Sequence, residues 1–266
     1  MPYLKGNKGL NWHYELEGDG PPLLFLHGWG VDMRIWRQQV KHFASKYRTV
    51  SIDFPGHGRS SWVSITLDDL AYGVCEILDF LKMENIDVVC SSFGGQVALR
   101  LFKKSPDKIK RLVLVGSSPK LVNTNGYSLG LPEDHVKKLS RQLESDYPAI
   151  VNIFFRSLFT IDERQGRRFK WLQIFRQNIS LPQKQALFNF LEIMRDSDVR
   201  DTLHSLSIPL QIVSGTDDYI CRREAVEYMA GMLPEANIHF FAKCGHFPFL
   251  TEPHEFNRVV EGFLKS

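Results

Sequence analysis

The sequence predicts an α/β protein with a mostly parallel central sheet and helices on both of its faces. Short apolar runs rich in Val, Ile, Leu and Phe recur along the 266 residues, and amphipathic segments of helical period stand between them. Uninterrupted apolar strands of this kind are typical of parallel sheets that helices cover on both faces. One connection is much longer than a crossover requires, which predicts an insertion.

The composition excludes several classes of protein. Hydrophobic residues make up 43% and charged residues 24% of the chain, as in ordinary globular proteins, and a net charge of +3 is too small to indicate nucleic-acid binding. The four cysteines form no C-x-x-C pair, so we expect no zinc site and no disulfide framework. The start lacks the apolar segment of a signal peptide, and no run approaches the roughly 18 apolar residues of a membrane span. We expect a cytoplasmic protein with no membrane or nucleic-acid partner, no metal and no cofactor.

Each apolar run is followed by a turn signal or a helical pattern, which sets the expected order of the elements. The alternating segment Leu10–Leu16 is expected to form an antiparallel edge strand. Buried strands are expected at Pro21–Gly28, Tyr47–Gly56, Ile86–Ser92, Arg111–Ser118, Pro209–Gly215 and Asn237–His246. Helices are expected at Leu67–Met83, Gly94–Lys104, Arg222–Met232 and Pro253–Lys265.

The long connection lies between the strands that end at Ser118 and begin at Pro209. Helical patterns within it predict a helical lid of residues 119–204, inserted into a core of residues 1–118 and 205–266. The alternative is an ordinary second core. The aromatic side chains of the insertion are expected to line a narrow apolar channel; they are Phe154, Phe155, Phe159, Phe169, Trp171, Phe175, Phe188 and Phe190.

The stretch "VVCSSFGGQVALRL" (residues 88–101) combines an apolar strand, a tight turn and a helix. A nucleophilic serine at such a corner needs small residues two positions before and after it, because strand and helix pass closely there. With Ser92 as nucleophile these positions hold Cys90 and a glycine, whereas Ser91 would place the bulky Phe93 in the second position. Ser92 is therefore the candidate, and Cys90 is expected to tighten the turn without breaking it. Taken alone, the stretch also fits a plain glycine-containing turn.

A serine hydroxyl needs a neighbouring base, and that base needs an orienting acid. His246 follows the last expected strand in "FFAKCGHFPF", at the same edge of the sheet as the serine, although a structural histidine is the alternative. An earlier strand ends in "SGTDD", which offers Asp218 as the acid and Asp217 as its rival. Asp53 precedes the serine and is expected to bond its own loop, since the acid follows the serine in sites of this kind.

Backbone N–H groups aimed at a developing oxyanion stabilise it, by about 2.7–4 kcal/mol for one measured donor. The residue after the nucleophile, Phe93, is one expected donor, and Trp29 in "LHGWG" is the other. The indole of Trp29 is also expected to form a wall of the acyl pocket.

In order along nearly the whole chain, "LHGWG", "DFPGHGRS", "CSSFGG", "GTDD" and "GHFPF" resemble the motifs of the α/β-hydrolase fold. More narrowly, "HGWGVDMRIW", "VGSSP", "RQLESDYPAIVNIFF", "FLEIMRDSDVRDTLHSLSIPL" and "FAKCGHFPF" resemble the esterases that hydrolyse the methyl ester of pimeloyl-acyl carrier protein in biotin synthesis. The resemblance implies a carboxylic ester hydrolase that acts on small-molecule or carrier-bound esters. It further implies Ser92, Asp218 and His246 as the catalytic triad, with the amides of Trp29 and Phe93 as oxyanion donors.

Positive charge is concentrated in the insertion. Six basic and two acidic residues lie between Arg156 and Arg176, a net charge of +4 that leaves −1 for the rest of the chain. A basic lid would steer an acidic acyl carrier protein towards the site. The alternative is a solvated charged face without a partner.

The resemblance also implies which lid residues bind the substrate and its carrier. Arg164 and Arg168 match two carrier-binding arginines of the family, and their spacing of four residues is expected to place both on one helical face. Ala149 and Ile153 stand where two further arginines would lie. Phe154 is expected among the residues that contact the substrate.

The same triad serves many reactions on this fold. A general carboxylesterase or a carbon–carbon bond hydrolase therefore stays open as an alternative. A ligand receptor that kept the fold but not the catalysis is a further alternative, from a different functional class.

Overall fold

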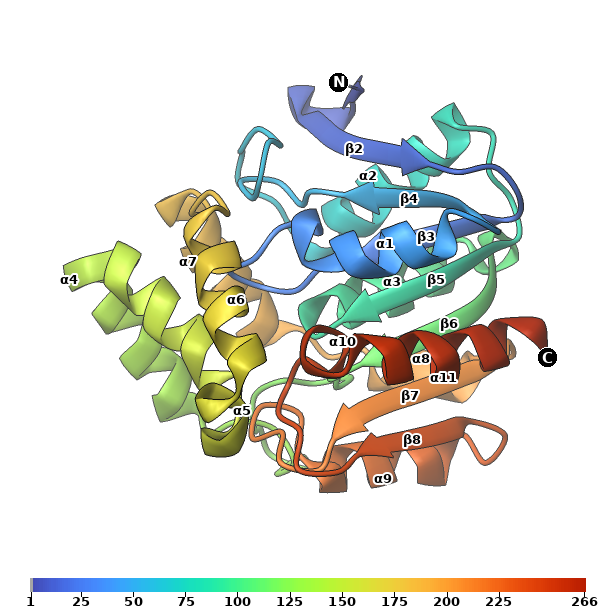
Figure 1. The fold of residues 1–266 in the computed structure, drawn as a ribbon. Coiled ribbons are helices and arrows are strands. Elements are labelled where there is room, and N and C mark those ends of the chain that lie inside the picture. The colour runs from blue at the N-terminus through green and yellow to red at the C-terminus, as the bar shows by residue number, and fades with distance from the viewer. Residues whose placement is uncertain (1) are drawn as a thin grey trace.

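The computed structural model describes residues 2–266, within which an eight-stranded sheet forms the centre of the molecule (Figure 1). The strand order is β1-β2-β4-β3-β5-β6-β7-β8. The strands are β1 (Tyr3–Lys5), β2 (Asn11–Glu17), β3 (Pro22–Leu26), β4 (Arg48–Ile52), β5 (Ile86–Ser91), β6 (Ile109–Val115), β7 (Leu210–Gly215) and β8 (Asn237–Phe241). The β1–β2 and β2–β4 pairs are antiparallel, and every pair from β4 to β8 is parallel. The prediction of a mostly parallel α/β sheet is confirmed.

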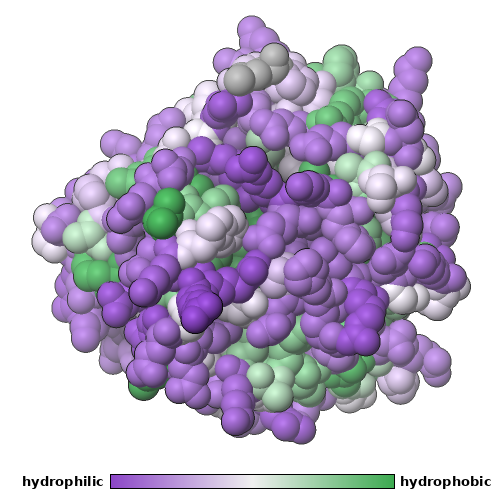
Figure 2. Space-filling view, viewed as in Figure 1, coloured by the Kyte–Doolittle hydropathy of each residue, from purple (hydrophilic) through white to green (hydrophobic). Residues whose placement is uncertain are grey.

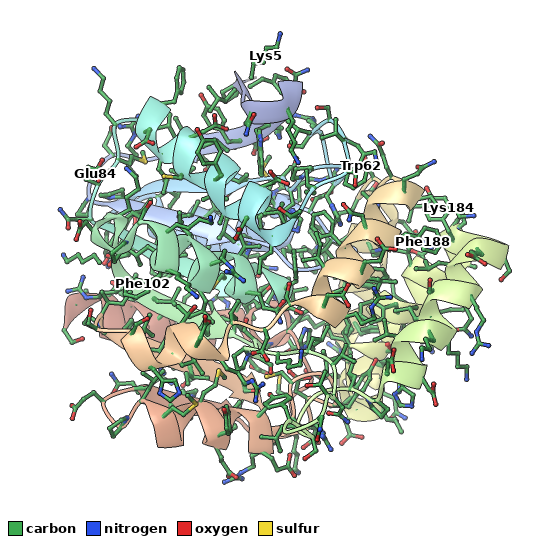
Figure 3. All side chains as sticks on the ribbon, turned by 180° about the vertical axis from the view of Figure 1, so that it is seen from behind. Lys5, Trp62, Glu84, Phe102, Lys184 and Phe188 are labelled. Carbon is green, nitrogen blue, oxygen red and sulfur yellow. The ribbon has the colours of Figure 1, made fainter. Side chains whose placement is uncertain are left out.

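Helices cover both faces of the sheet (Figures 1 and 3). On one face lie α1 (Arg37–Phe43) and α11 (Pro253–Lys265); on the other lie α2 (Leu67–Phe80), α3 (Phe93–Lys104), α8 (Arg200–Ser205) and α9 (Arg223–Met232). Alternate residues of β3 serve the two cores, since Leu23 and Phe25 pack with α1 and α11 whereas Leu24 and Leu26 pack with α2 and α3. This burial on both faces explains why the central strands lack a polar side. The edge strand β8, expected to be buried, is instead exposed or half-buried except at Phe241, because no strand covers its outer side.

Two expected elements differ from the structure at the sheet margins. β2 is antiparallel as expected, but it is not the edge strand, because the three-residue β1 pairs with its outer side. A strand this short shows too little alternation to be recognised in a sequence. The last strand also ends at Phe241 rather than at His246, which leaves residues 242–247 as a loop before the short helix α10 (Pro248–Thr251).

The long connection between β6 and β7 carries helices α4 (Glu133–Ser157), α5 (Ile161–Gln165), α6 (Arg167–Gln177), α7 (Lys184–Asp196) and α8. The first four gather beyond the carboxyl ends of the strands, at the left of Figure 1, whereas α8 packs beside α3. At the base of this insertion the Val199 N–H donates to the Pro119 carbonyl at 3.0 Å, so the two ends of the insertion lie side by side.

The longest helix of the insertion, α4, is interrupted near its middle. Asp146 has non-helical angles (φ −152°, ψ 73°), and Pro148 follows two positions later. Proline lacks the N–H that would continue the helix, and its ring disfavours a helical conformation in the preceding turn. The Asp146 carboxylate instead accepts from the Ala149 N–H at 3.2 Å and caps the second half. Within residues 2–266, no helix combines the length and the apolar character needed to cross a membrane.

Candidate active site

The turn between β5 and α3 holds Ser92 in a strained conformation. Its angles are φ 53° and ψ −124°, in a region that residues with a side chain rarely occupy. Ser92 is half-buried and lines a cavity, whereas the neighbouring Ser91 is fully buried on β5 and its hydroxyl has no hydrogen-bond partner. The serine chosen from the sequence is therefore the one whose side chain reaches a space that a substrate could enter.

The glycine two residues after Ser92 allows α3 to approach β3. A Cβ atom on Gly94 would lie 2.6 Å from the His27 carbonyl oxygen and 2.9 Å from that of Leu26. Both contacts are with backbone, which cannot move aside as a flexible side chain would. The close approach brings the first turn of α3 against the end of β3, where the expected oxyanion loop begins.

Replacing Gly94 by alanine is expected to destabilise the protein by about 1–3 kcal/mol, the usual effect of forcing an extra carbon into a packed core. Any hydrolysis that uses the expected Phe93 oxyanion donor should fall as well, because the displaced helix carries this amide. Gly262→Ala in α11 is the matched control, since its added Cβ meets nothing within 4 Å and alanine favours a helix. Thermal unfolding that gives equal midpoints for the two variants would contradict the prediction.

Cys90 occupies the position two residues before the nucleophile without disturbing the turn. It is fully buried on β5, and its thiol lies 3.3 Å from the Val113 carbonyl oxygen of β6. Burial raises the pKa of this thiol well above its ordinary value, so Cys90 carries no thiolate at neutral pH. The cysteine is a packing residue of the sheet, consistent with the expectation that it leaves the turn intact.

The loop after β8 brings an imidazole and a carboxylate together. His246 is only 2% exposed, and its Nδ1 lies 2.7 Å from Oδ2 of Asp218. The other carboxylate oxygen, Oδ1, accepts from the N–H groups of Ile220 at 2.8 Å and Cys221 at 3.0 Å. With Nδ1–H donated to the carboxylate, Nε2 is left to accept a proton. His246 and Ser92 line the same cavity.

The two other carboxylates considered from the sequence lie elsewhere. Asp217 is exposed, and its carboxylate accepts from the Thr216 hydroxyl at 2.9 Å. Asp53 accepts from the N–H groups of Arg59 at 2.9 Å and Met33 at 3.0 Å, so it holds its own loop as expected. The structure thus pairs the histidine with Asp218 and not with its rival.

The loop after β3 lies against the nucleophile. A Cβ on Gly28 would be 3.0 Å from Cβ of Ser92 and 3.6 Å from its hydroxyl oxygen. Trp29 follows in this loop, and Phe93 opens α3, where helix N–H groups have no partner within the helix. These positions suit the two amides expected to hold an oxyanion.

His27 stabilises this loop through two hydrogen bonds. The sequence did not predict a role for this histidine. Its Nε2 accepts from the Phe54 N–H at 2.9 Å, and its Nδ1 therefore donates to the Gly28 carbonyl at 2.7 Å. Burial lowers the pKa of His27, which keeps the ring neutral and suited to one accepting and one donating nitrogen. The histidine beside the glycine in "LHGWG" was the available signal.

A narrow apolar cavity of about 40 Å³ lies above Ser92, room for only a few water molecules. Its lining comes from the core, from α4 with the loop before it and the residue after it, and from α7: Trp29, Ser92, Leu121, Leu131, Val136, Leu139, Phe154, Leu158, Leu191, Met194, Ile220, His246 and Phe247. Phe154 meets Trp29 edge to face with ring centroids 4.8 Å apart, and the Trp29 indole donates to the Leu187 carbonyl at 3.1 Å. A larger hollow of about 540 Å³ near Leu203 and Pro234 holds none of the candidate catalytic residues, so we place the chemistry in the smaller cavity.

The expectation that Arg164 and Arg168 share one helical face is wrong. Gly166 is extended (φ −68°, ψ 153°) and separates α5 from α6, so the two arginines lie on different helices. Arg164 donates through Nε to the Thr160 carbonyl at 3.2 Å. Arg168 donates to the Leu250 carbonyl and, at 2.7 Å, to the side chain of Gln38. Some donors of both guanidinium groups are therefore used within the chain.

The remaining basic side chains of this segment differ in their exposure. Arg156, Arg167 and Lys170 are exposed, whereas Arg176 is buried with its guanidinium 5.6 Å from the ring centroid of Phe155. Burial lowers the pKa of Arg176 from its very high ordinary value. The net charge of +4 for residues 156–176 counts all of these cations equally, because a sequence does not show which side chains are exposed to solvent.

The parallel sheet, the strained serine at a strand–helix corner and the paired imidazole and carboxylate at the same edge define a class of enzyme, the hydrolases built on an α/β sheet. A model of the alpha/beta hydrolase family matches residues 23–259, and the chain belongs to this family. The predictions of this family, of its fold and of a hydrolytic enzyme are confirmed.

The chain is 33% identical over 245 residues to the pimeloyl-[acyl-carrier protein] methyl ester esterase of Nitrosomonas europaea, a match that covers 92% of this chain and 96% of that protein. An esterase from Exiguobacterium antarcticum has a similar structure, with a TM-score of 0.91, 24% identity and 99% of each chain covered. The enol-lactonase from Burkholderia xenovorans LB400 covers 100% of each chain with a TM-score of 0.89 and 20% identity. The two structural likenesses show the shared fold, and the named relative agrees with the predicted carboxylic ester hydrolase.

Proposed function

We propose that this protein hydrolyses the methyl ester of a pimeloyl chain carried by acyl carrier protein, a cytoplasmic step of biotin synthesis. The observation that carries the proposal is the narrow apolar cavity that Ser92 and His246 line together, with Asp218 hydrogen-bonded to the imidazole. The printed name of the Nitrosomonas europaea relative supports the choice of substrate. The helices α4 to α7, within residues 119–204, act as the lid in this proposal.

The reaction follows from the arrangement of these groups. His246 Nε2 takes the proton of the Ser92 hydroxyl as the oxygen attacks the ester carbonyl. The amides of Trp29 and Phe93 hold the oxyanion of the tetrahedral intermediate. Methanol leaves with the proton from His246, and water then repeats the sequence on the acyl-enzyme to release the carboxylic acid. Asp218 fixes the tautomer of the imidazole and stabilises its charged form.

The walls of the cavity suit the methylene groups of an acyl chain. They are almost entirely apolar, so the chain gains from burial of its methylene groups, about 0.8 kcal/mol for each. A volume of about 40 Å³ is too small for the chain, so α4 or α7 must move to admit it. Phe154 lies on α4 against Trp29, where such a movement would widen the space above Ser92.

The outer face of the lid provides a surface for an acidic carrier. Arg156, Arg167 and Lys170 are exposed there, flanked by the half-buried Arg164 and Arg168. Exposed apolar side chains accompany them, among them Ile153, Ile161, Trp171 and Ile174. Figure 2 shows hydrophobic residues among hydrophilic ones on the lid side of this face. Charge would steer the carrier, and the apolar side chains would give contact area.

The direct test is mass spectrometry of methyl-pimeloyl-acyl carrier protein incubated with the enzyme. A mass loss of one methylene, with release of methanol, is the expected result, and the Ser92→Ala variant should leave the ester intact. An unchanged carrier ester, with good turnover of short p-nitrophenyl esters, would instead identify a general carboxylesterase.

Reversing two exposed lid charges, Arg167→Glu with Lys170→Glu, is expected to lower kcat/KM for the carrier-linked ester by about 10-fold or more through slower association. Turnover of a small p-nitrophenyl ester should fall much less. The wild-type preference for the carrier should also weaken as salt rises from low to about 0.15 M ionic strength. The single reversal Arg167→Glu is matched in net charge by Lys5→Glu in β1, far from the lid in Figure 3. Equal effects of the lid and β1 variants on both substrates would contradict the proposal that the carrier protein docks on the lid.

A further inference from the structure

We propose that Glu163 of α5 is a positioning residue for His246: its carboxylate fixes the loop that carries the imidazole. The inference rests on the proposed function, in which His246 is the general base. Figure 1 shows α5 beside the loops that follow β7 and β8. A side chain of the insertion thus helps to hold the catalytic base, although the base belongs to the other part of the chain.

The first contact joins Glu163 to the residue directly before the histidine. Its Oε2 accepts from the Gly245 N–H at 3.1 Å. The neighbouring His246 N–H donates to the Leu158 carbonyl at 2.8 Å, just ahead of α5. Two successive N–H groups of the histidine loop are therefore held by one short segment of the insertion, which leaves the loop little freedom to rotate.

Gly245 makes this close contact possible. A Cβ at this position would lie 2.5 Å from the Leu158 carbonyl oxygen and 3.0 Å from Oε2 of Glu163. The backbones of the loop and of the insertion are therefore closer than any residue with a side chain would allow. A glycine directly before the histidine is explained by this packing.

The second carboxylate oxygen holds the loop one residue earlier. Oε1 of Glu163 lies 3.1 Å from the thiol of Cys244, which is also 3.2 Å from the Thr251 hydroxyl. Burial, with a further contribution from Glu163, raises the pKa of Cys244, so the thiol keeps the proton that it donates. The carboxylate is thereby engaged with two consecutive residues before His246.

The opposite side of the loop is held by the segment that carries the triad acid. The Asp217 N–H donates to the Cys244 carbonyl at 3.0 Å, next to Asp218. The loop is thus hydrogen-bonded to the insertion on one side and to the segment after β7 on the other. Without Glu163, the bonds of the loop to Asp217 and Leu158 and the ring bond to Asp218 would remain, but nothing would accept from the Gly245 N–H as Oε2 does. The backbone before His246 would then be freer to rotate, and the imidazole would lose alignment with Ser92.

A structural role for Glu163 is also present and has to be separated from the positioning role. Thr160 and Glu163 form a capping box at the start of α5: the Thr160 hydroxyl accepts from the Glu163 N–H at 3.1 Å, and Oε2 accepts from the Thr160 N–H at 2.7 Å. α2 begins with the same arrangement but uses Asp69, which shows that aspartate can close such a box in this protein.

Glu163→Asp is therefore the informative variant, because it keeps the charge and the capping box but draws the carboxylate back from Gly245 and Cys244. We expect kcat for a small p-nitrophenyl ester to fall by about 10- to 100-fold, the range for a misplaced catalytic group, with KM changed less than about twofold. Labelling of Ser92 by a fluorophosphonate should slow by a similar factor. Glu163→Gln should recover most of the activity, since its amide oxygen can accept from Gly245 as Oε2 does.

Two controls isolate the effect. Thr160→Ala weakens the cap of α5 without touching the histidine loop, and Asp162→Ala alters the adjacent exposed acid. Both should keep kcat near the wild-type value. Wild-type kcat in Glu163→Asp, or an equal loss in Thr160→Ala at the same thermal midpoint, would overturn the positioning role while leaving the proposed function intact. Ester turnover that persists in Ser92→Ala would instead overturn the proposed function itself.

Discussion

Ser92→Ala is expected to reduce kcat for ester hydrolysis by a factor on the order of 10⁶, as loss of the nucleophile does in a serine protease. Without the hydroxyl no acyl-enzyme can form, and only water held in the site can react. The variant should fold, because alanine keeps the Cβ that the strained turn already accommodates. Initial rates with a p-nitrophenyl ester and stoichiometric labelling with a fluorophosphonate measure the effect.

The adjacent serine is the matched control. Ser91 is fully buried and its hydroxyl has no hydrogen-bond partner, so Ser91→Ala should retain both turnover and labelling. If Ser91→Ala lost activity while Ser92→Ala retained it, the nucleophile would be Ser91 and not Ser92. The proposed mechanism would then have to be abandoned.

Asp218→Asn is expected to lower kcat by about 10⁴-fold, the loss found when the triad aspartate of another serine hydrolase is replaced by asparagine. The oxygen of the new amide would take over the N–H groups of Ile220 and Cys221, which turns the amide NH₂ towards His246. Nδ1 would then accept, Nε2 would carry the proton, and the imidazole could no longer receive the proton of Ser92.

Asp217→Asn tests the same chemistry one residue away. The exposed Asp217 carboxylate contacts the Thr216 hydroxyl and not the imidazole, so this variant should stay within about twofold of wild type, as surface changes usually do. Rates measured across a pH range of about 6 to 9 show whether a variant has lost activity or only has a shifted pH optimum. Comparable losses in both would show that the acid is not assigned correctly.

The local parts of the site could be predicted from the sequence because their requirements are local. A serine at a strand–helix corner needs a small residue two positions later, and this condition selected Ser92 over Ser91. No such local condition separates Asp217 from Asp218, because a shift of one residue changes neither the composition nor the motif spacing. It depends on turn geometry: Asp217 uses its N–H to bond the Cys244 carbonyl, and the next carboxylate then faces the histidine.

Other features depend on contacts between distant residues. Thr160 and Glu163 have the spacing of a capping box, which could have indicated that a new helix starts there. The break that places Arg164 and Arg168 on different helices lies at Gly166, and a glycine within a helical pattern was its only local signal. The hydrogen bond that the Gly245 N–H donates to Glu163 joins residues 82 positions apart, and no repeating pattern in the sequence indicates it. The exposure of each basic side chain on the lid likewise follows only from the packing of α4 to α6.

Pro119 and Val199 bond to each other where the insertion leaves and re-enters the sheet domain. The helices between these two residues could therefore be replaced as one unit by those of a related protein, through gene rearrangement, while β6 and β7 kept their register. Under the proposed function, such an exchange would alter the substrate preference and leave Ser92, Asp218 and His246 in place. The replacement segment would also need a carbonyl and a carboxylate that accept hydrogen bonds from the histidine loop, as Leu158 and Glu163 do. This requirement limits which related proteins could provide the segment for an active chimera.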